Sequence, residues 1–150
     1  MSAEEKVQER FKVFLQTHKR HPADAYNFIY ETLDWIHKRL IRSEGRPRHI
    51  SGKELALGFR DYAIEQFGLM ARTVLDSWNI RSTDHIGEMV FDLISLEMMG
   101  SSEDDQKSDF NGVFDFDEEF NIRPFAENLI PDRHEWVIRY RKVNTRPENN

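Results

Sequence analysis

Three side chains in the sequence have types and a spacing that suit metal chemistry. His85, Glu88 and Asp92 are three and four residues apart in a segment with helical periodicity, so they share one face of the expected helix. Zinc, iron and manganese accept imidazole and carboxylate ligands, provided that another helix completes the site. This face, however, lies about 130° from the apolar stripe of the same helix, counted at ~100° per residue. We therefore favour a solvent-exposed polar stripe over a metal site, and we expect no metal and no cofactor.

The other common signatures of catalysis are missing. The chain contains no GxSxG, HExxH, Walker or GxGxxG sequence, and its acidic segment 101–109 lacks the ligand order of an EF-hand. It also contains no cysteine, which excludes disulfides, thiolate zinc sites and cysteine nucleophiles. We expect neither an enzyme nor a small-molecule ligand. The absence of cysteine, of a signal-peptide pattern and of a long apolar run favours a cytoplasmic protein that does not contact membranes.

Helical periodicity dominates the elements that must position these residues. Apolar side chains recur at helical spacing in five segments, which are residues 4–17, 22–41, 53–66, 69–77 and 83–98. Ser51 and Glu54 form a capping box at the start of the third segment. Gly68 and Gly100 are expected to end the third and fifth. Residues 112–116 and 136–142 alternate between apolar and polar, which is typical of strands.

These elements predict one domain that is mainly α, a compact multi-helix domain with a short β element near the C-terminus. We divide residues 1–150 into an N-terminal helix (1–20), a long helix with a basic loop (21–50), a three-helix core with an acidic loop and a short strand (51–120), and a C-terminal extension with a further strand (121–150). The length of 150 residues suits a single domain.

The order of elements in residues 51–116 is winged-helix-like. Three helices would be followed by a hairpin of residues 98–100 with 112–116, and residues 101–111 would be the wing. The helix at 83–98 would then be the element that reads DNA.

Charge argues against that use. The formal net charge is −6, and residues 82–120 hold 12 Asp/Glu and one Lys. DNA-binding surfaces need cations to neutralise phosphates, so this segment would repel DNA, and we do not expect nucleic-acid binding. Two basic clusters leave a contact through another face open; they are Lys38, Arg39, Arg42, Arg46 and Arg48, and Arg139, Arg141 and Lys142.

Three predicted helices carry a second pair of apolar residues opposite the main stripe. The pairs, each seven positions apart, are Phe28 and Trp35, Leu57 and Ile64, and Phe91 and Met98. They either pack on a second side inside one bundle, which we favour, or form an exposed patch that binds another chain.

Because no chemistry stands out, the leading hypothesis is a non-enzymatic protein–protein interaction or regulatory module that can self-associate. The six residues of these pairs are its contact candidates. One alternative is a winged-helix-like regulator that binds nucleic acid. The other is a small metal-dependent enzyme built on His85, Glu88 and Asp92.

Most of the chain also resembles a known group of sequences. The segments HPADAYNFIYETLDWIHKRL (21–40), HISGKELALGFRDYAIEQFGLMARTVLDSWNIRSTDHIGEMVFDLISLEMM (49–99) and DFNGVFDFDEEF (109–120) resemble a family of conserved hypothetical bacterial proteins restricted mainly to planctomycetes and verrucomicrobia. The resemblance covers about residues 21–120. It implies a bacterial cytoplasmic domain and assigns no activity, cofactor or site residue.

Overall fold

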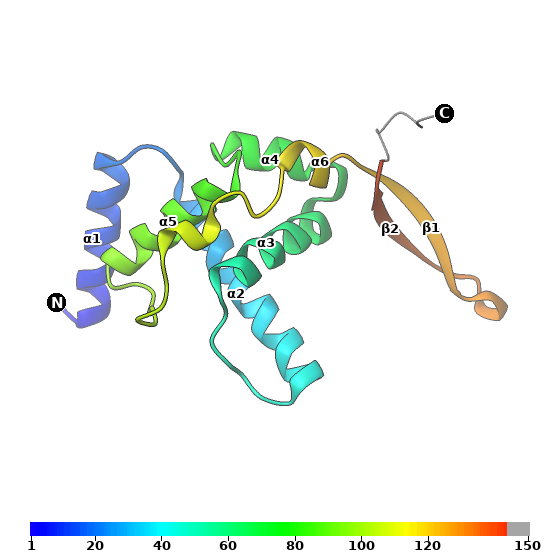
Figure 1. The fold of residues 1–150 in the computed structure, drawn as a ribbon, viewed down its shortest axis with the longest axis horizontal. Helices are drawn as coiled ribbons and strands as arrows, with labels where there is room; N and C mark the ends of the chain where they lie inside the picture. Colours follow the sequence, from blue (N-terminus) through cyan, green and yellow to red (C-terminus); the bar gives the residue numbers. More distant parts are fainter. Residues whose placement is uncertain (144–150) are drawn as a thin grey trace.

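The protein is mainly α-helical and has a two-stranded antiparallel sheet towards its C-terminus, as predicted (Figure 1). The computed structural model describes residues 1–143, so the last seven residues of the predicted extension 121–150 lie outside the described part. The elements are α1 (Ala3–Thr17), α2 (Ala23–Glu44), α3 (Gly52–Phe67), α4 (Ala71–Ser77), α5 (Thr83–Ser95), α6 (Phe116–Glu119), β1 (Ile122–Ile130) and β2 (Glu135–Lys142), with 3₁₀ turns at Gly68–Met70, Lys107–Phe110 and Pro131–Arg133. Within residues 1–143, no helix has the length and apolar content that crossing a membrane requires.

The core lies between α2, α3 and α5. Its fully buried side chains come mainly from the predicted apolar stripes and include Tyr26, Ile29, Phe59, Leu75, Ile80, Ile86, Met89 and Leu93. Helix α3 approaches α2 closely at Gly58, where the side chain of Ile36 occupies the place of a Cβ. The predicted capping box at the start of α3 is confirmed, with Ser51 and Glu54 each binding the other's backbone N–H.

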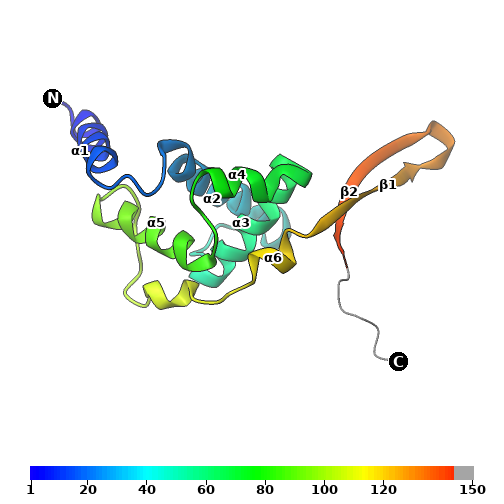
Figure 2. The same ribbon diagram turned by 90° about the horizontal axis from the view of Figure 1, so that it is seen from above.

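Helix α1 and the hairpin of β1 and β2 lie at opposite ends of the molecule (Figures 1 and 2). Phe11 and Phe14 of α1 meet the ring of Tyr26 edge-on, at centroid distances of 5.6 and 6.0 Å. The N-terminal helix is therefore fastened to the core through aromatic contacts, whereas the hairpin projects away from it.

Helix α5 ends earlier than the predicted Met98. Its last residue is Ser95, and Glu97 adopts a left-handed conformation with φ of 59°. The Met98 N–H then donates to the Leu93 carbonyl at 2.9 Å, which is the bond that closes a Schellman-type helix end. Phe91 and Met98 therefore do not share one helical face.

The predicted strand at 112–116 is wrong, and so is the winged-helix-like interpretation of residues 51–116. The sheet in the described residues consists of β1 and β2 alone. Asp115 instead caps α6 by accepting from the Glu118 N–H, and the rings of Phe114, Phe116 and Phe120 pack together at 5.1–6.2 Å. The alternation of aromatic residues thus serves a local aromatic cluster and a short helix, and no wing forms beside α5.

The strand predicted at 136–142 is confirmed as β2, and its partner β1 was not predicted. The two strands pair from Ile122 with Lys142 to Ile130 with Glu135, with an irregularity between Asn128 and Ile130. Side chains at paired positions lie on the same face of the ribbon.

Candidate functional site

The face of α5 that carries His85, Glu88 and Asp92 is covered by residues 20–26. Asp92 accepts a hydrogen bond from the Tyr26 hydroxyl at 2.9 Å. The Arg20 guanidinium lies 3.8 Å from Glu88 and 4.0 Å from Asp92. The expected solvent-exposed stripe is therefore wrong, because it forms a polar contact between α5 and the start of α2. A metal ion at this place would have to displace the arginine.

The histidine of this face is also engaged. His85 Nδ1 accepts from the Arg81 N–H at 3.0 Å. Within residues 1–143, no three or more His, Cys, Asp or Glu side chains are grouped so as to hold a metal ion. The spacing of His85, Glu88 and Asp92 predicted a shared face correctly, but the structure gives that face other partners.

Sequence reasoning did not single out His21 as a site residue. His21 is 5% exposed, and its Nδ1 donates to the Trp78 carbonyl at 2.9 Å. Burial lowers the pKa of His21, and the nearby His85 and Arg20 act in the same direction. His21 therefore joins the start of α2 to the end of α4 as a neutral hydrogen-bond donor. The Pro22 that follows indicated the helix start, but no local pattern indicated the burial.

Most of the predicted contact residues pack within the chain. Phe28 is 3% exposed and lies among the rings of Phe59, Tyr62, Phe67 and Trp78 at centroid distances of 5.0–5.4 Å. It cannot reach a partner. The half-buried Trp35, Ile64, Phe91 and Met98 pack against the core, and Leu57 is also half-buried.

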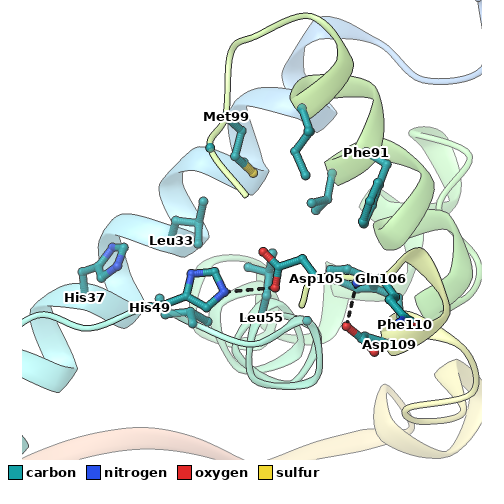
Figure 3. Close-up of a pocket in the computed structure, with 15 residues that line it drawn as sticks. Leu33, His37, His49, Leu55, Phe91, Met99, Asp105, Gln106, Asp109 and Phe110 are labelled. Carbon is teal, nitrogen blue, oxygen red and sulfur yellow. Dashed lines mark hydrogen bonds and ion pairs between the residues drawn. The ribbon is translucent and has the colours of Figure 1, made fainter. Parts of the chain in front are cut away.

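A cavity of about 240 Å³ lies between α2, α3, α5 and the acidic segment (Figure 3). Leu33, Leu55, Phe91, Met99 and Phe110 give it an apolar wall. At its edge, His49 Nε2 donates to Asp105 Oδ1 at 3.0 Å, and the Ser102 N–H donates to the other oxygen at 2.7 Å. Burial raises the pKa of Asp105, but these two hydrogen bonds outweigh it and the pKa is lowered.

Two carboxylates that line the cavity already accept hydrogen bonds from the protein. Asp105 holds His49 and the acidic segment, and Asp109 accepts from the Gln106 N–H at 3.0 Å. These hydrogen bonds hold the acidic segment against the helices, so both carboxylates already have partners within the chain.

The hairpin carries the most exposed apolar surface of the C-terminal part. The middle of one face contains Pro124, Ala126, Ile138 and Tyr140, and Trp136 follows them opposite Asn128, as the strand register requires; Lys142 lies on the same face at its root. Trp136 is 60% exposed and Ile138 is 58% exposed. A two-stranded ribbon has no second layer of its own, so this apolar face meets water in the single chain.

The opposite face of the hairpin is basic. It carries Arg123, Arg139 and Arg141 together with Phe125 and Glu127. The Arg141 guanidinium lies 3.8 Å from the centroid of the Phe125 ring, and Arg139 pairs with Glu127 at 2.6 Å. The ribbon thus has one apolar and one arginine-rich face.

Contacts with the helical body are concentrated at the root of the hairpin. Tyr140 packs its ring against Gly68, and Lys142 pairs with Glu119 of α6 at 3.3 Å. The rest of the hairpin projects from the helices (Figure 2), and Trp136 and Ile138 on the apolar face remain exposed.

Comparisons with protein-family models, with curated proteins and with solved structures found no match to this chain. Its function is therefore inferred from the geometry of the described residues.

Proposed function

We propose that this protein is a non-enzymatic protein–protein interaction module that binds through the apolar face of the β1–β2 hairpin. The observation that carries the proposal is the exposure of Trp136 and Ile138 side by side on that face. Exposed apolar patches with a polar surround are typical of interaction sites, and tryptophan is enriched among the residues that dominate binding energy.

The proposed surface differs from the one that the sequence suggested. Phe28 is buried among aromatic rings of the core, and four of the other five candidates pack against the core. The second basic cluster contributes to the proposed surface, because Arg139 and Arg141 lie on the face of the hairpin opposite Trp136. They can orient an approaching partner through charge, while the apolar face supplies the contact area.

A bacterial origin and a cytoplasmic location belong to the same proposal. The resemblance of residues 21–120 and the lack of cysteine support them.

Site-specific crosslinking in the native host tests the proposal. A photoreactive benzoylphenylalanine at Ala126, beside Ile138 on the apolar face, should give a discrete protein adduct whose partner mass spectrometry identifies. Adding Trp136→Ser should remove the adduct. The control is Val13→Ser, since Val13 is 52% exposed on α1, at the other end of the molecule; it should leave the adduct intact. If no protein is crosslinked from position 126, the hairpin is not a protein-binding surface and the proposal is wrong.

A further inference from the structure

The backbone of the hairpin shows which polar groups face outward. The Val143 N–H donates to the Asn121 carbonyl at 2.8 Å, so these two residues form a hydrogen-bonded pair. Such pairs alternate along an antiparallel ladder with pairs whose N–H and C=O groups point away from the partner strand. Counting from residue 143 along the register, Trp136, Ile138 and Tyr140 belong to the second kind. Their backbone groups form the outer edge of β2.

The two outer edges are not equivalent. Pro124 lies opposite Tyr140 and therefore also points outward, where it has no N–H to offer. The outer edge of β1 thus lacks a donor at this position. Strand β2 contains no proline, and in residues 1–143 no other strand pairs with it. An uncovered edge of this kind is a template for another strand.

We propose that β2 pairs with β2 of a second copy of this chain, antiparallel and across a two-fold axis at Ile138. The two hairpins then form one four-stranded sheet in the order β1-β2-β2-β1. This inference rests on the proposed function and names its partner. It uses the same apolar residues, because Ile138 meets its own copy and Trp136 lies beside Tyr140 of the partner subunit.

Charge selects this register. With the axis at Ile138, Glu135 lies opposite Arg141 of the partner subunit, and the pair occurs twice by symmetry. Neither Glu135 nor Arg141 has an ion pair within residues 1–143. An axis at Arg139 would place that arginine against its own copy, and like charges directly opposite each other destabilise a sheet.

An axis at Val137 is also less favourable. It would direct Glu135 to Arg139 of the partner subunit, although Arg139 already pairs with Glu127 at 2.6 Å, and Arg141 would extend past the start of the paired strand, since β2 begins at Glu135. The contact between two strand edges is smaller than a standard interface of about 1,600 Å². We therefore expect a dimer that depends on protein concentration.

Cysteine trapping tests the axis, because the chain has no cysteine of its own. In the purified full chain, Ile138→Cys should form a covalent dimer on mild oxidation, since directly opposed residues lie about 5.5 Å apart. Trp136→Cys is the matched control, because Trp136 is 60% exposed against 58% for Ile138 and lies on the same face. Its copies would be about 13 Å apart along the strands, at ~3.3 Å per residue, so it should form no covalent dimer. Equal trapping at both positions would overturn the register.

Charge reversal gives a second, independent test by light scattering. Glu135→Arg alone and Arg141→Glu alone should each weaken the dimer by tenfold or more. Mixing the two variants should restore dimers, because each chain then places the opposite charge at both contacts. A mixture that remains monomeric contradicts the proposed pairing.

The outcomes separate this inference from the proposed function. A chain that is monomeric at all concentrations, without trapping at residue 138, overturns self-pairing; a crosslinked adduct with a different protein from position 126 would still support the interaction module. A monomer that binds duplex DNA in a salt-dependent way, and loses this on substitution of Arg123, Arg139 and Arg141 by Ala, also overturns self-pairing. The ribbon would then act in a DNA groove.

Discussion

Tyr140 of β2 lies directly against Gly68, the residue that ends α3. Gly68 has φ of +54°, a left-handed region that favours glycine, and a Cβ at this position would collide with the hydroxyl of Tyr140. One glycine therefore serves two purposes, because it turns the chain at the end of α3 and leaves space for the tyrosine that anchors the hairpin.

Gly68→Ala should destabilise the protein by about 1–3 kcal/mol, through backbone strain and the clash with Tyr140. Chemical denaturation measures this loss. Relative to the wild type, amide hydrogen exchange should become faster in β1 and β2 by more than it does in α5. Tyr140→Ala removes the clash but not the strain. The double variant should consequently be more stable than the sum of the two single losses predicts. Strict additivity would show that Tyr140 does not rest on Gly68 in solution.

Arg48 and Glu54 form an ion pair at 2.7 Å. This pair should make the stability of the protein depend on pH in the acidic range. Hydrogen bonds from Arg48 first, and from Ser51, lower the pKa of Glu54 to about 2 from a usual 4.5. Since the folded-state pKa lies below the unfolded one, the stabilising effect is complete above about pH 4.5 and is lost as the pH falls towards 2. Carboxyl NMR titration should find this low pKa, and Arg48→Met should raise it. Arg46→Met is the control, and an equal effect there would contradict a specific pair.

Local patterns predicted the helices well because their causes are local. The capping box of Ser51 and Glu54 and the apolar stripes of α2, α3 and α5 are set by residues within a few turns of one another. The end of α5 was mispredicted because Glu97, a residue without the freedom of glycine, adopts the left-handed conformation there. Strand β1 was missed because Pro124 interrupts its alternation, and its role on an outer edge depends on β2.

The candidate surface could be predicted only in part. The strand that carries Trp136 follows from alternation, but its exposure depends on how far the hairpin projects from the helices. The burial of Phe28 depends on rings of α3 and on Trp78, the residue after α4, which the spacing within α2 cannot reveal. Similarly, Asp92 looked exposed because helical projection takes no account of Tyr26, which comes from another element.

Tyr26 and Asp92 form a partly buried contact that should contribute to stability. Tyr26 is 1% exposed, and its hydroxyl donates to Asp92 at 2.9 Å. Burial and the Asp92 charge raise the pKa of Tyr26, so the phenol remains a donor. Tyr26→Phe should cost about 1–2 kcal/mol, because the carboxylate loses a charge-assisted hydrogen bond and keeps only Arg20.

Urea denaturation checks this value against Tyr62→Phe. The hydroxyl of Tyr62 lies 3.4 Å from Glu31 at an exposed position, so its loss should cost less than about 0.5 kcal/mol. Equal losses in the two variants would mean that the hydrogen bond from Tyr26 to Asp92 stabilises the fold no more than the exposed one from Tyr62 to Glu31 does.

His21 should make the fold sensitive to mild acid. Burial first, and then His85 and Arg20, hold the pKa of His21 below its usual 6.5, while Glu88 and the Trp78 carbonyl act in the opposite direction. The unfolded chain therefore binds a proton at a higher pH than the folded chain does. The stability that depends on neutral His21 is complete above about pH 6.5 and falls as the pH is lowered through this value.

His21→Gln keeps a donor for the Trp78 carbonyl but cannot be protonated. Between pH 7 and pH 5 it should lose less stability than the wild type, and at pH 7 it should be less stable by about 1 kcal/mol because the amide fits the imidazole site imperfectly. Denaturation at both pH values measures the difference. The control is His18→Gln, since His18 is exposed and stacks on Phe14 at 4.6 Å. If His18→Gln flattens the pH dependence as much as His21→Gln does, the acid sensitivity does not come from the buried imidazole.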